Sequence, residues 1–190
     1  MRPSALVLPV LAAAVLLHDP RPARADEYSH GFYAELGLGA HTFLGQTGQY
    51  AAVGPSFGIR SGYDLFSWLS LGAYLAGSTH EATVPPPPDR EYFQLYTGAA
   101  EGRITVRVWR LALFAEGTLG AAAVSTNVLD RVAVTEPDSH LTMVFGGGGG
   151  LDYHIQNRHF SIGLACDYAL YPSFDASSAL NVRLYLRYAK

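Results

Sequence analysis

The sequence predicts an all-β fold, an eight-stranded antiparallel up-and-down transmembrane β-barrel. Three observations carry this prediction. Apolar residues recur with period two in eight segments of about ten residues, the length of a tilted strand that crosses a bilayer. The opposite side of these segments is rich in glycine and other small residues, which a narrow barrel interior accommodates. Short and long connections alternate along the chain, as in barrels with turns at one end and loops at the other.

Seven of the segments have one bulky apolar side and one small or polar side. In the first, Leu36 and Leu38 share a side, and Glu35 lies on the other. A soluble barrel would place charged residues, and few glycines, on its outer face, so this pattern favours lipid outside over a lipocalin-like periplasmic binder. The seven segments are residues 32–41, 53–63, 69–78, 111–121, 141–154, 160–170 and 182–188.

The remaining segment, residues 92–106, fits the alternation less well. Phe93 and Leu95 predict an apolar, lipid-facing side for the odd-numbered residues. Glu101 and Arg103 then fall on that same side. The prediction for this segment therefore needs a β-bulge that shifts the register and returns the two charges to the interior.

Charged residues on the polar sides of the other segments predict a network inside the barrel. Placed in one lumen, they give four carboxylates and three arginines, close to the balance that buried charges need. This lumen polar network is expected to be structural. Its predicted members are Glu35, Arg60, Glu116, Asp152, Asp167, Arg183 and Arg187.

The N-terminal residues 1–25 are typical of a secretory signal peptide. Arg2 is followed by an apolar stretch too short to span a bilayer comfortably, and then by the small-residue pattern Ala23-Arg24-Ala25. Residues 26–190 are then the barrel domain. We expect the protein in the bacterial outer membrane, with both termini on the periplasmic side, where the short turns lie.

Composition excludes several other classes of protein. The formal net charge of −3 and the lack of any Lys/Arg run argue against a nucleic-acid partner. The single cysteine, Cys166, excludes disulfides and cysteine-based zinc sites, and we expect it to be a small apolar filler facing lipid. His41, His80 and His140 should lie near the extracellular rim, but their spacing supports no metal site. No cofactor is predicted.

Aromatic residues near the predicted strand ends suggest belts at both membrane interfaces. On the periplasmic side these are Phe32, Tyr63, Phe66, Trp68, Trp109, Phe160 and Tyr188. On the extracellular side they are Phe43, Tyr50, Tyr92, Phe93, Tyr168, Tyr171 and Phe174.

The second long connection contains a proline run, which favours a stiff polyproline II rod that is pre-ordered for docking. A rigid loop without a binding role explains the same run equally well. The candidate extracellular interaction loop consists of Pro85, Pro86, Pro87, Pro88, Asp89 and Arg90.

Two further motifs favour structural interpretations. The glycine run 146–150 lacks the lysine and the following helix of a phosphate loop, so it indicates a strand that bends or packs closely against lumen side chains. His159 and Ser161 resemble the His-x-Ser of small outer-membrane lipid A deacylases. Here Ser161 is expected to face inward at a periplasmic turn, without a matching downstream Glu, so we predict that the protein is not an enzyme.

Residues 28–190 resemble the OmpA-like and OmpX-like small outer-membrane barrels, although this chain ends Tyr188-Ala189-Lys190 instead of at an aromatic residue. Three segments also resemble the CglE-type barrel of the myxobacterial adventurous gliding motility machinery. They are residues 62–72, 78–88 and 155–160. This resemblance implies a non-enzymatic component of an envelope-spanning motility complex, whose partners are outer-membrane lipid and other envelope proteins.

Three functions therefore remain open at the level of sequence. The first is a structural and interaction barrel with a closed lumen, acting through its loops or periplasmic turns. The second is a small pore or solute-binding barrel, which needs a continuous water path. The third is a lipid-modifying enzyme of the outer membrane.

Overall fold

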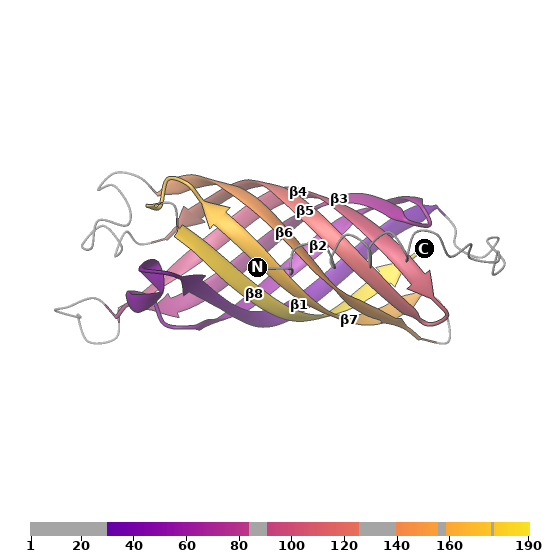
Figure 1. Cartoon of the computed structure of the whole chain (residues 1–190), viewed down its shortest axis with the longest axis horizontal. Helices are drawn as coiled ribbons and strands as arrows, with labels where there is room; N and C mark the ends of the chain where they lie inside the picture. The colour runs from indigo at the N-terminus through magenta and orange to yellow at the C-terminus, as the bar shows by residue number, and fades with distance from the viewer. Residues whose placement is uncertain (1–29, 84–90, 126–139, 156–158, 176) are drawn as a thin grey trace, which may run out of the picture.

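The computed structural model describes residues 30–83, 91–125, 140–155, 159–175 and 177–190. Within these ranges, eight antiparallel strands pair in chain order, and the last pairs with the first, which closes the barrel (Figure 1). The up-and-down barrel is therefore confirmed. The strands are β1 (Gly31–Leu44), β2 (Gly54–Phe66), β3 (Leu69–Glu81), β4 (Tyr92–Val108), β5 (Leu111–Val124), β6 (Leu141–His154), β7 (Phe160–Tyr171) and β8 (Ser177–Ala189), and a 3-10 turn, η2 (Thr47–Gln49), follows β1.

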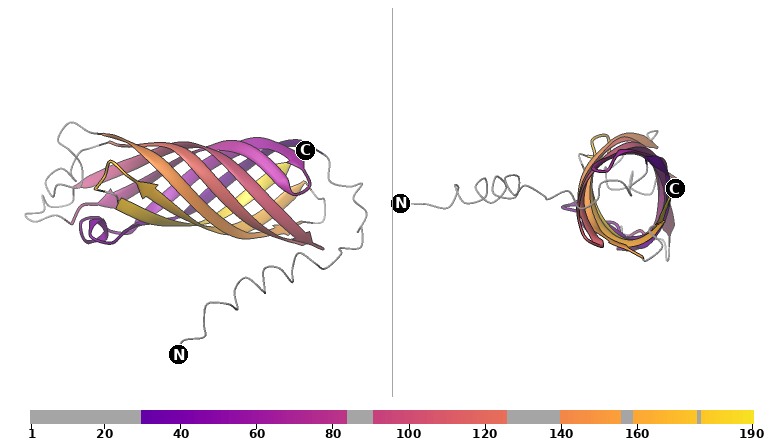
Figure 2. Two further views of the ribbon diagram at one scale, coloured as in Figure 1. Left: turned by 45° about the horizontal axis from the view of Figure 1, so that its top comes forward. Right: turned by 90° about the vertical axis from the view of Figure 1, so that its right-hand side faces the viewer.

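The two ends of the barrel differ in their connections (Figure 2). At one end, which we call the terminal end, β1 begins and β8 ends, and the N–H of Lys190 donates to the carbonyl of Phe32 at 3.0 Å. The short connections at this end are residues 67–68, 109–110 and 155–159. The opposite end, which we call the loop end, carries residues 45–53, 82–91, 125–140 and 172–176.

Some predicted features fall outside the described residues. The predicted signal peptide, residues 1–25, and the candidate interaction loop, residues 85–90, are among them. In the part of the chain that the structure describes, no helix has the length and apolarity needed to cross a membrane.

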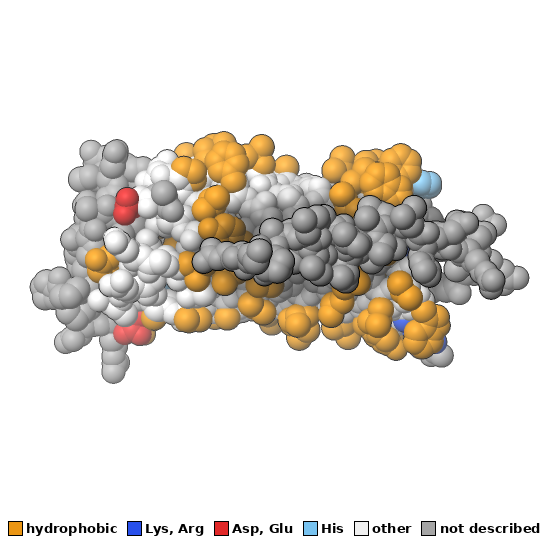
Figure 3. All heavy atoms as spheres, in the orientation of Figure 1, with side chains coloured by type: hydrophobic (Ala, Val, Ile, Leu, Met, Phe, Trp, Pro, Cys, Tyr) orange, Lys and Arg blue, Asp and Glu red, His pale blue; other side chains and the backbone are white. Residues whose placement is uncertain are grey.

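The outer surface is apolar over most of the barrel. Large hydrophobic side chains alternate with interior residues on every strand and cover the middle and the terminal end in Figure 3. Such a surface is stable against hydrocarbon and not against water. Representative exposed residues on the eight strands are Leu36, Ile59, Leu75, Ile104, Leu113, Leu151, Leu164 and Leu184.

The glycine run lies within β6 and makes room for interior side chains. A Cβ on Gly148 would lie 2.5 Å from Oδ1 of Asp167, and one on Gly150 would lie 2.8 Å from the ring of Phe114. Both distances are shorter than van der Waals contact. The predicted close packing against lumen side chains is confirmed, and a phosphate loop is excluded because the run is a paired strand.

Strand β4 keeps one register over its whole length, with no bulge in its pairing to β3 or β5. Its odd-numbered residues face the interior throughout, so Phe93 and Leu95 are buried on the same side as Glu101 and Arg103. The prediction that Phe93 and Leu95 face lipid was wrong. The charges reach the interior without a shift of register.

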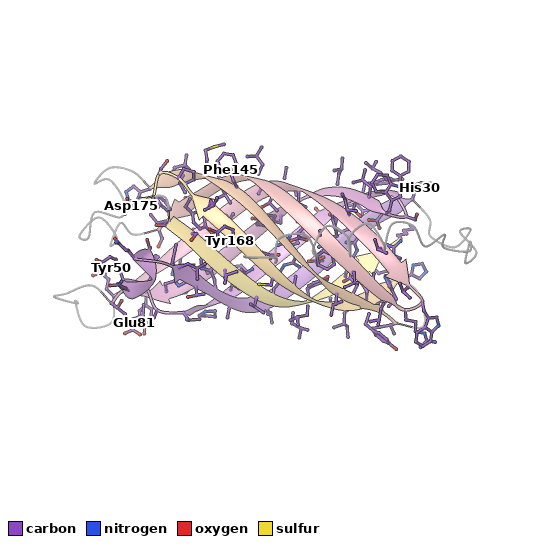
Figure 4. The ribbon with its side chains drawn as sticks, in the orientation of Figure 1. His30, Tyr50, Glu81, Phe145, Tyr168 and Asp175 are labelled. Atoms are coloured by element: carbon purple, nitrogen blue, oxygen red, sulfur yellow. The ribbon has the colours of Figure 1, made fainter. Side chains whose placement is uncertain are left out.

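Phe93 and Leu95 face inward because the interior of the barrel is apolar toward the loop end, whereas it is charged in the middle. Outward-facing residues there include the polar Thr42, Glu81, Gln94 and Ser125 beside the exposed Val53, Tyr92 and Leu141, and few of the described side chains at the loop end are hydrophobic on the face that Figure 3 shows. Figure 4 places Tyr50, Glu81 and Asp175 at this end. The interior of this section is an apolar cluster formed by Phe43, Ala51, Ala82, Phe93, Leu95, Ala122, Val124, Val144, Tyr171, Phe174 and Ala179. This part of the barrel is built like a soluble protein, with its apolar residues inside.

The same change in the interior corrects the predicted aromatic belts. At the loop end, Tyr92 and Tyr168 are exposed, but Phe43, Phe93, Tyr171 and Phe174 are buried in the apolar cluster, so their assignment to a lipid interface was wrong. At the terminal end the aromatic residues predicted for the belt lie on the outer surface; those with large exposed areas are Phe32, Tyr63, Phe66, Trp68, Trp109 and Tyr188.

Candidate functional site

Charged side chains from six strands meet in the middle of the lumen. We call this group the ionic cluster; among the described residues its members are Glu35, Arg60, Glu101, Arg103, Glu116, Asp167 and Arg183. Asp167 exposes 18% of its side chain, and each of the others exposes 8% or less. Buried charges of this kind depend on their ion pairs and hydrogen bonds for stability.

Glu116 on β5, like Glu35 on β1, contacts all three arginines of the cluster. Its Oε1 accepts hydrogen bonds from Arg60 Nη1 at 3.0 Å and Arg183 Nη2 at 2.8 Å. Its Oε2 accepts from Arg103 Nε at 3.2 Å and Nη2 at 3.0 Å. One carboxylate therefore joins β2, β4 and β8 across the lumen.

The other carboxylates complete the ring around the arginines. Each of them pairs with at least one guanidinium group, and Glu101 also accepts from the hydroxyl of Tyr33 at 3.1 Å. The remaining ion pairs are Glu35–Arg60, Glu35–Arg103, Glu35–Arg183, Glu101–Arg60, Asp167–Arg60 and Asp167–Arg183.

Aromatic rings form the second set of contacts for the arginines. The ring faces attract the cations and match their planar shape, which adds to the ion pairs in a site shielded from water. The distances from guanidinium carbon to ring centroid are 4.5 Å for Arg60 over Tyr74, 4.2 Å for Arg103 over Phe114 and 4.7 Å for Arg183 over Tyr185.

The structure does not bring all the predicted network residues into one group. Glu35, Arg60, Glu116, Asp167 and Arg183 belong to the ionic cluster. Two others form separate pairs: Arg187 bonds to Asp64 at 2.6 Å, and Asp152 accepts from the hydroxyl of Tyr185 at 2.5 Å. The predicted set is therefore divided between the cluster and two smaller contacts.

Sequence reasoning left Glu101, Arg103 and Asp64 out of the predicted network, and it brought Glu101 and Arg103 to the interior only through a bulge that the structure does not have. The side of the strand that carries Glu101 and Arg103 was predicted from Phe93 and Leu95, the apolar residues at its start. The two charged residues are themselves two positions apart and therefore point to the same side. Reading the strand from its charges would have found them, because an isolated charge facing lipid is costly.

Two small cavities lie between lumen side chains of the described residues. One, of about 60 Å³, lies between the ionic cluster and the apolar cluster and is lined by His41, Arg60, Glu116 and Asp167 among others. Another measures about 20 Å³. A hollow of about 820 Å³ is lined largely by outward-facing apolar residues of the neighbouring strands, such as Leu36, Ile59 and Leu75, and so belongs mainly to the outer surface.

The residues considered for chemistry do not form a reactive set. Ser161 is buried in the lumen, whereas His159 is exposed at the terminal end, with its Nδ1 3.0 Å from the carbonyl of Ala189. Cys166 is exposed on the outer surface. His41 and His80 contact each other, but no group of three or more His, Cys, Asp or Glu within the described ranges is arranged to hold a metal ion.

The closed barrel and its charged interior agree with the family to which the sequence is matched. Residues 5–187 match the model described as the outer membrane protein beta-barrel domain. The chain belongs to this family. Membership indicates the bacterial outer membrane as its location, and the apolar outer surface is therefore in contact with lipid.

Solved structures show the same fold at low sequence identity. Neisserial surface protein A has a TM-score of 0.62 and 14% identity, with 84% of this chain and 97% of that one covered. OprG from Pseudomonas aeruginosa has a TM-score of 0.58 and 11% identity, with 85% of this chain and 96% of that one covered. Ail, the attachment invasion locus protein of Yersinia pestis, has a TM-score of 0.56 and 12% identity, with 86% of this chain and 100% of that one covered. No curated protein matches the chain in sequence.

Proposed function

We propose that the protein is a non-enzymatic structural and interaction barrel with a closed lumen, which takes part in an envelope complex through its connections. The observation that carries this proposal is the double filling of the lumen. The ionic cluster occupies its middle, and the apolar cluster occupies its loop end. Eight strands enclose an interior only wide enough for side chains, so both layers obstruct a solute.

The two lumen cavities described above are small. The larger, of about 60 Å³, has room for a few water molecules. Its walls include Arg60 and Glu116, which are held by several ion pairs each. Widening the path would require these pairs to separate inside the membrane, which is costly for buried charges.

The proposal places the loop end outside the cell and the terminal end, with both termini, in the periplasm. The polar outer face of the loop end supports this orientation, because it extends the barrel beyond the apolar band. Longer connections are found on the extracellular side of outer-membrane barrels, and short turns on the periplasmic side. Partners would then meet the long connections, including residues 85–90, or the periplasmic turns.

We further propose that the complex is that of gliding motility. The support for this step is the resemblance of residues 62–72, 78–88 and 155–160 to CglE-type barrels. Crosslinking in intact cells followed by affinity purification tests it, because partners are then captured in their native envelope. Recovery of motility proteins is the expected result. Recovery of unrelated envelope proteins alone would keep the interaction barrel and remove the motility role.

Planar bilayer recordings test closure of the lumen. We expect no stable ohmic current from the purified protein. The pore alternative predicts such currents, together with a change of ion selectivity when Arg60→Ala or Glu116→Ala is introduced. Currents with that behaviour would refute the closed barrel. Mass spectrometry of lipid A after expression tests the enzymatic alternative, and we expect an unchanged spectrum.

A further inference from the structure

Two histidines meet inside the apolar cluster at the loop end. His41 on β1 and His80 on β3 have ring centroids 5.0 Å apart, and Nδ1 of His41 lies 3.1 Å from Nε2 of His80. His80 has no exposed surface, and its ring stacks on Phe93, while Phe43 contacts both imidazoles. A pair of titratable groups is thus enclosed by aromatic side chains.

The partners of each ring nitrogen fix the direction of the hydrogen bonds. His80 Nδ1 lies 2.8 Å from the carbonyl oxygen of Ala52, so it carries the hydrogen, and Nε2 of a neutral His80 is an acceptor. His41 Nδ1 then donates to His80 Nε2, which also accepts from the Ser78 hydroxyl at 2.9 Å. Nε2 of His41 is left to accept from the hydroxyl of Tyr171 at 3.4 Å. In this arrangement both imidazoles are neutral.

His80 also holds the first connection, residues 45–53, against the end of β3. Besides the bond from His80 to Ala52, Ala51 of this connection forms a β-bridge with Ala82. The N–H of Ala52 donates to the backbone carbonyl of Glu81 at 2.9 Å. The N–H of Thr83 donates to the carbonyl of Tyr50 at 2.9 Å. The His80 side chain links these backbone contacts to the interior of the barrel.

A proton added to the pair places a positive charge among apolar side chains. On His80 Nε2, the new N–H would require His41 to change its tautomer and the Ser78 hydroxyl to turn, and the cation would be enclosed by Phe43 and Phe93. On His41 Nε2, it would place a cation beside Tyr171, within the apolar cluster. The carboxylates that line the nearby cavity are Glu116 and Asp167, and both are already paired with arginines.

The other groups around the pair do not compensate for an added charge. Arg60, which faces the same cavity, is a cation and disfavours a second one. The outward carboxylate next to His80, Glu81, faces solvent. The titratable and charged side chains that line the cavity with His41 are Arg60, Tyr74, Glu116, Asp167, Tyr168 and Tyr171.

We propose that His41 and His80 form an acid-sensitive latch for the first connection at the loop end. With both rings neutral, the latch is closed and residues 45–53 are fixed to β3. Protonation of either ring separates the pair. His80 then leaves the interior, because it is next to Glu81, the exposed last residue of β3, and the connection becomes mobile. This inference stands independently of the proposed function and of the direction of insertion.

Spin labelling of the first connection tests the latch. Gln46→Cys is labelled in a Cys166→Ala background, since Gln46 is exposed and Cys166 is the only native thiol. Label mobility is followed in lipid vesicles from about pH 7.5 to about pH 4, the range that covers histidine protonation in most sites. We expect mobility to rise on acidification and to return on neutralisation.

His80→Asn is the decisive variant, because its amide retains a donor toward Ala52 and takes up no proton. The acid-induced rise should be lost in this variant. His140→Asn is the matched control, since His140 is an exposed histidine at the same end, and it should behave like the parent protein. A heat-modifiability shift on a gel verifies that each variant is folded. An unchanged acid response in His80→Asn, or a loss of response in His140→Asn, would overturn the proposal.

Histidine-labelled NMR of the unsubstituted protein gives a test without any variant at the pair. At neutral pH the nitrogen shifts should show His80 protonated at Nδ1 only and hydrogen-bonded to His41. On acidification these two signals should change together with the mobility of the connection. A pair that stays neutral and in contact while the connection becomes mobile would refute the latch.

Discussion

Glu116→Gln is expected to destabilise the barrel strongly although it improves the charge balance. With all groups ionised, the ionic cluster has four carboxylates and three arginines among the described residues, so removing one negative charge makes it neutral. A simple count of charges therefore predicts a neutral or favourable effect. The geometry predicts the opposite, because each of the two carboxylate oxygens of Glu116 accepts two hydrogen bonds from arginine donors, four in all.

The magnitude follows from these hydrogen bonds. The amide that replaces one oxygen points N–H groups at guanidinium donors, so two of the four bonds are lost. A hydrogen bond to a charged group contributes roughly 1.5–3 kcal/mol, which gives a loss of about 3–6 kcal/mol in the free energy of unfolding. This agrees with the cost of about 3–5 kcal/mol for breaking a buried ion pair.

Urea unfolding in phospholipid vesicles, followed by the fluorescence of Trp68 and Trp109, measures this change. Asp152→Asn is the matched control, since Asp152 accepts from the hydroxyl of Tyr185 and an asparagine oxygen still accepts this hydrogen bond. We expect a loss of about 1 kcal/mol or less there. The reasoning is refuted if Glu116→Gln costs no more than Asp152→Asn, because the charge count would then outweigh the hydrogen bonds.

Three further predictions concern packing and the two zones of the barrel. Gly163→Ala should lower the free energy of unfolding by about 1–3 kcal/mol, since its Cβ would lie 2.2 Å from a tyrosine ring, whereas Gly117→Ala, with open space around it, should be close to neutral; urea titration compares the two. Leu75→Arg, on the lipid face, should cost about 2–4 kcal/mol, and Gln94→Arg, on the polar outer face of the loop end, should cost little; equal costs for both would argue against a polar outer face at the loop end. Phe93→Ala should cost about 3–5 kcal/mol as a core deletion, and a cost below about 1 kcal/mol would place the ring outside the barrel.

The period of the sequence was sufficient to predict most of the strands. The alternation of Leu36 and Leu38 with Glu35 places apolar and polar residues on opposite sides only if the chain is extended. Such a strand is stable where its apolar side meets lipid and its polar side meets the lumen. Short connections such as residues 67–68 permit only antiparallel neighbours, so the order of the strands followed as well. These are local properties, and each is present within a few residues of the chain.

The site was predicted in part, for a similar reason. An arginine at position 60 or 183, opposite bulky apolar neighbours, has to face the interior wherever the strand crosses hydrocarbon. Which carboxylate it meets depends on strand stagger and closure, since Glu35 and Arg183 are separated by most of the chain and are joined only because β8 pairs with β1. Sequence reasoning therefore found most of the charges and none of their pairings.

The sequence by itself determined that the chain forms alternating strands with an apolar and a polar side, in a simple antiparallel order. The tertiary structure decided which side is inside at each level of the barrel. Phe93 and Arg103 lie on the same side of β4 and are both inside, because the interior changes along the barrel from the apolar cluster at the loop end to the ionic cluster in the middle. The residues next to a position in the sequence do not show on which side of this change in the interior it lies. Closure of the barrel fixes, for every strand residue, its position along the barrel axis and the side to which it points.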